Sequence, residues 1–415
     1  MEKLRQKFYE KYASTQIDTI RDVINTIDWE NRFIGIKGSR GVGKTTLVLQ
    51  YIKQHYSPNN DVLYVSLDDL YFSENKLYHL AAIFYKKGGK LLAIDEVHRY
   101  PNWASELKNM YDDFPLLKVI FTGSSLLHLQ QAKADLSRRT VMYHLAGLSF
   151  REFLYFETKQ VFPILSLEEV VSNHVALAIQ ITTPIAPEKP PKSRGRQGQV
   201  IGVKPLSYFD AYLKYGYYPF YNENKNSFHQ KLSETILTIL EVDIPQFASI
   251  QTSNIIYLKK LLQIISVSVP FKPNMNVLSE RTGISLNTMK LYLKLLSDAQ
   301  VLQLLYVPNK GINSLNKPEK IYLNNANLLF NQGNENVNVG NLRETFFMNQ
   351  LSNNYTIQAS KEADFLVANK FTFEIGGKNK SKKQIKNTAN AFVVKDDIEV
   401  GSDNIIPLWL FGFLY

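Results

Sequence analysis

The chain has 415 residues, of which 45% are hydrophobic and 21% are charged, and its formal net charge is +10. This length and composition predict a globular protein of two or three domains, each large enough to bury a core. The absence of cysteine excludes disulfides, thiolate metal sites and a cysteine nucleophile, and is compatible with a reducing cytoplasm. The basic charge favours nucleic-acid partners but is also common among enzymes of this size, so it selects no function class.

Neither end of the sequence resembles a targeting or membrane segment. Residues 1–12 are charged and aromatic and lack the apolar stretch of a signal peptide. The apolar run 405–415 is far shorter than the roughly 20 residues that span a bilayer. We expect residues 404–415 to form a buried final strand. These features predict a cytoplasmic protein without a membrane partner.

The strongest motif is G-x-x-x-x-G-K-[ST], placed between an expected strand over 32–37 and an expected amphipathic helix over 45–55. Glycines permit a backbone that turns successive N–H groups toward phosphate oxygens, and the following helix adds its positive end. We therefore predict a phosphate loop in which Lys44 contacts the β- and γ-phosphates of a nucleotide and Thr45 binds magnesium. The residues expected around the nucleotide in this loop are Gly38, Ser39, Arg40, Gly41, Val42, Gly43, Lys44, Thr45 and Thr46.

A second nucleotide motif is the apolar run 90–94, which ends in Asp95 and Glu96. In a parallel sheet the carboxyl ends of the strands face the ligand. We therefore expect Asp95 to hold magnesium and Glu96 to act as the base that polarises the attacking water. Strands and helices alternate through this part of the chain, which predicts an α/β fold with a parallel sheet covered on both faces.

Two further features of this region each have two interpretations. An expected strand over 116–121 closes with Thr122, Gly123, Ser124 and Ser125. A small polar residue at this strand end can sense the γ-phosphate or position the attacking water, while Ser124 or Ser125 can also cap the next helix. Arg138 and Arg139 can stabilise the transition state on a neighbouring subunit, which requires a homo-oligomer, or form a solvated basic pair.

The order of these motifs resembles a known family. The runs GSRGVGKTTL, LLAIDEVHRYPNW, VIFTGSS, DLSRRT and LAGLSFREFL follow one another as in the AAA-superfamily ATPases of bacteria and archaea that carry a C-terminal domain of uncertain function. The resemblance spans nearly the whole chain and implies an AAA-type core that binds ATP. In related ATPases a glycine-and-proline motif contacts the base; Pro219 corresponds to it, although Tyr217 replaces a second glycine and the run is also an ordinary helix stop.

A helical segment follows the sheet and is expected to form a lid over the nucleotide. It contains an insertion near 182–204 that is rich in proline, glycine and basic residues and has no periodicity. This composition is typical of a solvated loop, although its basic residues can also contact nucleic acid. The family resemblance does not cover this insertion.

The pattern over 277–293 predicts two helices joined by a turn at Gly283, and strands are expected over 301–307 and 320–323. Together these elements predict a winged helix. Such a fold can place its second helix in the major groove of double-stranded DNA. The second helix has few basic residues, however, and a role in packing or protein binding is equally compatible with it.

The end of the chain resembles restriction-type nuclease folds of the PD-(D/E)xK kind. Glu344 on an expected helix, and Asp364 and Glu374 at the ends of two strands of an expected hairpin, correspond to carboxylates that hold magnesium in such folds. The lysine two residues beyond the last acid is replaced by Gly376, and the nearest substitute is Lys378. Either Lys378 reaches the site, or the fold serves for binding without cleavage, which we favour because hydrolysis needs a group that positions water.

These motifs predict an ATPase that uses ATP and Mg²⁺ and couples hydrolysis to its C-terminal half, with double-stranded DNA as a candidate partner. The alternative is a slow ATP-gated switch for signalling or defence that binds a protein partner and has an inactive nuclease-like domain. The predicted domains are the AAA-type core 1–147, the helical lid 148–245, the winged helix 246–325 and the nuclease-like domain 326–415.

Overall fold

The structure is a computed structural model in which the chain packs as two compact units. It describes residues 1–123, 136–183, 203–248, 250–267, 272–308, 317–332, 337–381 and 383–415. The first unit consists of Met1–Gly147, Tyr218–Glu223 and Glu234–Thr252, and the second of Leu148–Tyr217, Asn224–Ser233 and Ser253–Tyr415. Within those described ranges no helix combines the length and apolar character that a bilayer crossing needs.

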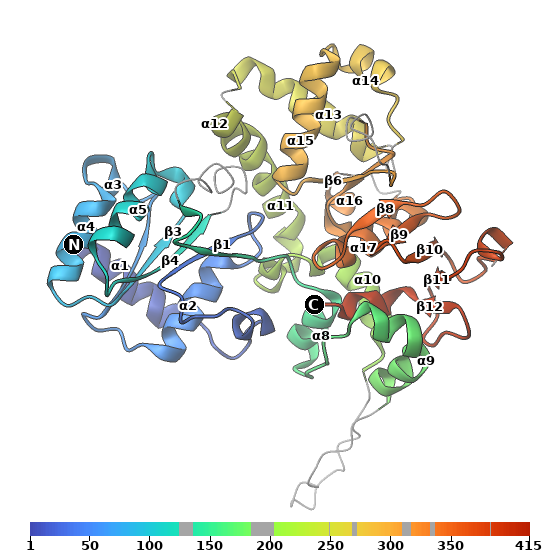
Figure 1. The fold of residues 1–415 in the computed structure, drawn as a ribbon, viewed down its shortest axis with the longest axis horizontal. Helices are drawn as coiled ribbons and strands as arrows, with labels where there is room; N and C mark the ends of the chain where they lie inside the picture. The colour runs from blue at the N-terminus through green and yellow to red at the C-terminus, as the bar shows by residue number, and fades with distance from the viewer. Residues whose placement is uncertain are drawn as a thin grey trace, which may run out of the picture. The chain divides into compact units, whose positions relative to one another are not determined.

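A five-stranded parallel sheet forms the centre of the first unit, as the sequence predicts (Figure 1). Its strand order is β2-β3-β4-β1-β5. The strands are β1 (Phe33–Lys37), β2 (Val62–Ser66), β3 (Leu91–Asp95), β4 (Lys118–Gly123) and β5 (Val141–His144). The first four are almost wholly buried, which is typical of parallel strands with helices on both faces. The edge strand β5 is partly exposed.

Helices of the first unit join these strands. Helix α2 begins directly after Gly43, and α5 ends at Asp113, two residues before Pro115. The helices are α1 (Glu2–Ser14), η1 (Asp22–Asn25), α2 (Lys44–His55), α3 (Tyr71–Glu74), α4 (Leu77–Lys86), η2 (Val97–Arg99), α5 (Trp103–Asp113), η4 (Pro219–Asn222), η6 (Ile239–Asp243) and α12 (Ile244–Ala248).

The second unit is mainly helical at its start. Ser149 and Ser166 each begin a helix with a capping box, in which serine and the glutamate three residues later exchange hydrogen bonds. Its helices are α8 (Phe150–Thr158), α9 (Leu167–Thr182), α10 (Pro205–Ala211), η3 (Tyr212–Gly216), η5 (Lys225–Ser227), α13 (Ile255–Val267), α14 (Met275–Thr282), α15 (Leu286–Asp298), α16 (Ala326–Gln332), α17 (Val339–Ser352), η9 (Lys383–Ile385) and η10 (Leu408–Phe413). Two further helices, α11 (Phe228–Thr238) and η7 (Thr252–Asn254), include residues of both units.

A mixed sheet of order β12-β11-β10-β9-β8 closes the chain (Figure 1). Its strands are β8 (Ile357–Ala359), β9 (Phe365–Val367), β10 (Phe371–Gly376), β11 (Ala391–Lys395) and β12 (Ile405–Pro407), and a separate antiparallel pair is formed by β6 (Leu302–Leu305) and β7 (Lys320–Leu323). The strands β9 and β10 form the expected hairpin. Helix α17 packs on the sheet through Phe347, whose ring lies 5.2 Å from both Phe365 and Phe373 and 4.7 Å from Phe411.

Two expectations differ from the structure in the second unit. A strand was expected over 404–415, but β12 covers only Ile405–Pro407, because proline cannot donate to a sheet ladder. The chain then continues as the buried 3₁₀ helix η10. The single lid expected over 148–245 is divided between both units. Its helices α8 and α10 pack on C-terminal side chains, since the rings of Phe150 and Phe413 lie 6.1 Å apart and those of Phe209 and Phe346 lie 4.8 Å apart.

Candidate functional site

The loop between β1 and α2 has the geometry of a phosphate cradle. Gly41 and Gly43 have φ values of 85° and 94°, in the left-handed region that other residues adopt only with strain. At Gly38 a Cβ atom would lie 2.2 Å from the carbonyl oxygen of Leu145. The three glycines of the motif are therefore required by the fold of the loop itself.

Lys44, the first residue of α2, is buried beneath this loop. Its Nζ donates hydrogen bonds to the carbonyl oxygens of Gly38 at 3.0 Å and Ser39 at 2.8 Å. Burial lowers the pKa of Lys44 to about 8, against the opposing charges of Glu96 and Asp95. The Ser39 hydroxyl is also buried and has no hydrogen-bond partner among the residues that the structure describes, so the loop holds polar groups that a phosphate can satisfy.

Asp95, at the end of β3, accepts hydrogen bonds on both carboxylate oxygens. The Thr45 hydroxyl and the Tyr64 hydroxyl each donate to Oδ2 at 2.7 Å, and Thr122 donates to Oδ1. The two residues expected to bind one magnesium ion are thus in direct contact. A hydroxyl and a carboxylate side by side fit the oxygen ligands that magnesium prefers.

Glu96 follows β3 in a left-handed conformation with φ of 55°. Such a backbone is uncommon for a residue with a side chain and is concentrated at functional sites. Its Oε2 lies 3.4 Å from Nε2 of the fully buried His98, and its backbone N–H donates to Thr122 at 3.4 Å. Glu96 is thereby held beside Asp95 at the carboxyl end of the sheet.

The sequence places Thr122 among the small polar residues at a strand end, but neither Thr122 nor Tyr64 was predicted to be a partner of Asp95. Thr122 comes directly before Gly123 at the end of a buried strand, so its position at a strand end was a usable signal. Tyr64 lies in the middle of β2, where no motif marks it. Burial raises the pKa of Tyr64, and Asp95 raises it further, so this phenol stays a hydrogen-bond donor at neutral pH.

The buried carboxylate of Asp243, about 200 residues after the phosphate loop, lies near an arginine of that loop. Asp243, in η6, has its Oδ2 3.7 Å from Nη1 of Arg40 and its Oδ1 3.4 Å from Nη2 of Arg99. Its side chain is 3% exposed, and a buried carboxylate requires such positive partners. Sequence reasoning did not find Asp243, because it lies about 200 positions from Arg40 with no motif around it.

Pro219 lies against the phosphate loop, in the segment of the first unit formed by η4. A Cβ atom on Gly43 would lie 3.6 Å from Cγ of Pro219, and one on Gly41 would lie 2.9 Å from the ring of Phe220. The residue transferred from the family resemblance is therefore near the loop. Its contact with a base stays a prediction.

The remaining predicted residues are not brought together in the same way. Arg139 forms a two-pronged ion pair with Asp112 of α5, with distances of 3.0 and 3.1 Å, whereas Arg138 is exposed. Thr46 is exposed on α2. Ser124 lies outside the described residues.

Comparison with known protein families gives two matches. Residues 30–154 match the family model described as an AAA domain. The chain carries an AAA-type P-loop ATPase domain. Residues 206–334 match a domain of unknown function, and no curated protein sequence matches the chain significantly.

Solved structures that resemble the chain include ATPases. The Walker-type ATPase PABY2304 of Pyrococcus abyssi has 12% identity and a TM-score of 0.37, with 80% of this chain and 95% of that chain covered. AMPPCP-bound DnaA from Aquifex aeolicus has 13% identity and a TM-score of 0.26, with 71% and 88% covered. PCH-2 of C. elegans has 14% identity and a TM-score of 0.23, with 47% and 54% covered.

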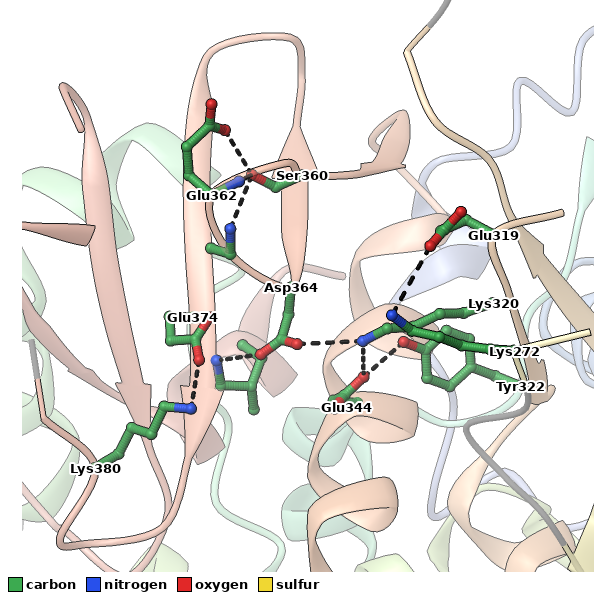
Figure 2. A network of polar contacts seen from close by, with 12 residues as sticks. Lys272, Glu319, Lys320, Tyr322, Glu344, Ser360, Glu362, Asp364, Glu374 and Lys380 are labelled. Carbon is green, nitrogen blue, oxygen red and sulfur yellow. Dashed lines mark hydrogen bonds and ion pairs between the residues drawn. The ribbon is translucent and has the colours of Figure 1, made fainter. Parts of the chain in front are cut away.

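The acids expected for a nuclease-like metal site meet in the second unit, outside the AAA domain (Figure 2). Nζ of Lys320, on β7, donates to Glu344 Oε2 at 2.9 Å and to Asp364 Oδ1 at 3.2 Å. The Tyr322 hydroxyl donates to the same Glu344 oxygen at 2.6 Å. We call Glu344, Asp364 and Glu374, with Lys320 and Lys380, the carboxylate cluster.

The lysine beside Glu374 is not the one that the sequence suggests. Lys380 forms an ion pair with Glu374 (Figure 2), and it lies over Gly376, where a Cβ atom would be 2.6 Å from Cβ of Lys380. Lys378 is exposed, and its carbonyl oxygen accepts a hydrogen bond from Lys395. The turn after β10 thus brings in a lysine two residues beyond the expected Lys378.

Proposed function

We propose that this protein binds ATP with magnesium and hydrolyses it in the AAA domain. The observation that carries the proposal is the 2.7 Å hydrogen bond between Thr45 and Asp95 beside the buried Lys44. It joins the phosphate loop to the acidic strand end, the two features that phosphoryl transfer requires. The AAA family match supports the adenine nucleotide.

In this proposal each side chain has one task. Thr45 and Asp95 hold the magnesium ion, which when bound neutralises phosphate charge. Lys44 and the N–H groups of the loop bind the β- and γ-phosphates. Glu96 orients the water that attacks the γ-phosphorus and accepts its proton as the bond to the leaving phosphate oxygen breaks. His98 positions Glu96, and Pro219 contacts the adenine.

Glu96→Gln tests the assignment of the base. We expect it to lower steady-state ATP turnover by about 100-fold or more, since general base catalysis contributes at least that much, while ATP binding is retained. Lys44→Ala should lose binding as well. Glu74→Gln, a change of an exposed glutamate on α3, is the matched control. If the wild type turns over no faster than Glu96→Gln, the base assignment fails and a gated switch becomes the better description.

We also propose that α14, α15, β6 and β7 form a winged helix that contacts the target of the ATPase. What supports it is a helix pair joined by Gly283 in the left-handed conformation, with φ of 73°, and followed by an antiparallel strand pair. The exposed Lys290 and Lys294 on α15 can contact DNA phosphates. Duplex DNA added to the ATP turnover assay distinguishes a DNA target from a protein target. A higher turnover rate with DNA supports a DNA target, and an unchanged rate supports a protein target.

A further inference from the structure

The carboxylate cluster gathers acids and lysines from four elements of the second unit (Figure 2). Glu344 lies on α17, Asp364 precedes β9 and Glu374 lies on β10. Lys320 comes from β7, where it pairs with Leu305 of the neighbouring strand. The cluster therefore includes a lysine from outside both α17 and the mixed sheet, which carry the acids, at a position that no sequence motif marks.

Lys320 is held in place by both of its carboxylate partners. Its side chain is 14% exposed, and those of Glu344 and Asp364 are 16% and 18% exposed. The second oxygen of Asp364 accepts the backbone N–H of Ile375 at 2.9 Å, which fixes the carboxylate toward Lys320. Burial alone would lower the pKa of Lys320, but the charges of Glu344 and Asp364 outweigh it and raise the pKa, so the side chain is an ammonium ion at neutral pH.

A second observation concerns Glu374. Its residue is 2% exposed, and Oε2 has no hydrogen-bond partner within the part of the chain that the structure covers. Burial raises the pKa of Glu374, Lys380 opposes the shift, and Asp364 and Glu344 add to it. A buried carboxylate oxygen without a donor is costly, so the cluster holds more acidic oxygens than its two lysines contact.

The donors present do not fit the divalent metal that a nuclease-like fold implies. A magnesium site needs several oxygens that converge on one ion without a positive group among them. Here the ammonium of Lys320 already contacts the Glu344 and Asp364 oxygens that face it. A metal ion bound to the same two oxygens would be repelled by this ammonium group, since both are positive and would lie a few ångströms apart. Across the described ranges, no three acidic or histidine side chains are arranged to hold a metal ion, so Glu344 and Asp364 would have to move closer together to bind one after removal of Lys320.

We propose that the ammonium group of Lys320 is the built-in cation of the carboxylate cluster. It takes the position between Glu344 and Asp364 that a divalent metal ion would need, and it ties β7 to α17 and to the start of β9. The acids then form a structural ion-pair network with Lys320, and the second unit performs no metal-dependent hydrolysis at this cluster. This inference concerns the second unit alone and does not depend on ATP hydrolysis.

Removal of Lys320 should convert the cluster into a metal site. The experiment counts Mn²⁺ bound to the full-length, nucleotide-free protein by electron paramagnetic resonance, with Asp95→Asn in every sample to remove the magnesium ligand of the AAA domain. We expect Lys320→Met to bind Mn²⁺ at least tenfold more tightly than its parent and to gain thermal stability from Mn²⁺, which the parent does not. The further change Asp364→Asn should abolish both gains. Lys272→Met is the matched control, because Lys272 is 70% exposed and 3.9 Å from Glu319 (Figure 2).

Three results would overturn the proposal. The first is Mn²⁺ binding by the parent that falls on Asp364→Asn, which would mean that a metal already displaces Lys320. The second is a folded Lys320→Met protein without a new Mn²⁺ site. Lys320→Gln, whose amide still donates a hydrogen bond to Glu344, is the second variant if Lys320→Met does not fold. Failure of both variants to fold even with Mn²⁺ present would also contradict replacement of the ammonium by a metal.

Discussion

At the scale of single residues, Lys44 links nucleotide binding to pH. Its pKa is lowered to about 8 by burial, with Glu96 and Asp95 opposing the shift. Bound phosphates add negative charge around the ammonium and raise this pKa. ATP binding above pH 8 is therefore coupled to uptake of a proton by Lys44.

We expect the ATP association constant to fall as the pH rises through about 8, approaching tenfold for each pH unit. The contribution of Lys44 to folding stability changes with pH in the opposite direction to the ATP association constant. The pKa of Lys44 is lower in the folded than in the unfolded chain, so the unfolded chain holds more protons between about 8 and 10.4, and the contribution of Lys44 to the unfolding free energy increases with pH there.

Calorimetry from about pH 7.5 to 9.5, in two buffers that differ in ionisation enthalpy, measures both the affinity and the proton uptake. Lys44→Met, which removes the titrating group, is the control wherever its residual binding can be measured. An affinity that is constant over this range, without proton uptake, would contradict the link.

The residues that the sequence identifies are those whose partners are close in the chain or marked by a motif. The phosphate loop and the pair Asp95 and Glu96 satisfy this condition, because each is a contiguous run at a strand end. Tyr64 and Asp243 do not satisfy it. The contact of Tyr64 depends on the pairing of β2 with β3, and the contacts of Asp243 depend on the return of the chain to the first unit. Lys378 was chosen by spacing, whereas the turn after β10 presents Lys380.

At the scale of helices and strands, the buried apolar runs were the most predictable. The expected strand over 32–37 is β1, and the expected hairpin near Asp364 and Glu374 is β9 and β10. A run of residues buried on both faces admits few alternatives to a central strand. The prediction of a strand beyond Pro407 was wrong, because apolar character alone does not distinguish a buried strand from the buried helix η10.

Helix α17 anchors the mixed sheet through one aromatic side chain. Phe347 is fully buried against Phe365, Phe373 and Phe411. We expect Phe347→Ala to lower the unfolding free energy of the second unit by about 3–5 kcal/mol, since it removes packed atoms and leaves a cavity.

Urea unfolding followed by circular dichroism measures this change. Leu291→Ala is the matched control in the same unit, because Leu291 is 47% exposed on α15 and its replacement should change the unfolding free energy by less than about 0.5 kcal/mol. Equal effects of the two substitutions would show that α17 does not support the sheet.

At the scale of the whole molecule, the division into units could not be read from the order of elements. Helices that follow a sheet in the chain are expected to cover that sheet. Here the C-terminal carbonyl oxygen of Tyr415 instead accepts hydrogen bonds from Ser149 at 2.8 Å and from Arg151 at 3.0 Å. Contacts between residues so far apart in sequence leave no periodic signal.

Arg138 tests whether the ATPase works as an assembly. If Arg138 stabilises the transition state on a neighbouring subunit, ATP turnover per subunit should rise with protein concentration, and Arg138→Ala should give a low rate at every concentration. Arg139→Ala is the paired variant, since it breaks the ion pair with Asp112 instead. A wild-type rate that does not change with concentration would count against catalysis in trans.

The chain leaves the first unit after Gly147 and returns to it for Tyr218–Glu223 and Glu234–Thr252. These returning segments supply neighbours of the phosphate loop. Pro219 and Phe220 lie against its glycines, and Asp243 pairs with Arg40. A gene fragment that ends with the family match at residue 154 would encode the motifs without these neighbours. Recombination between relatives could therefore exchange the nucleotide site together with these neighbours only by carrying the chain at least through Asp243, and the Leu148–Tyr217 and Asn224–Ser233 segments of the second unit would be transferred with it.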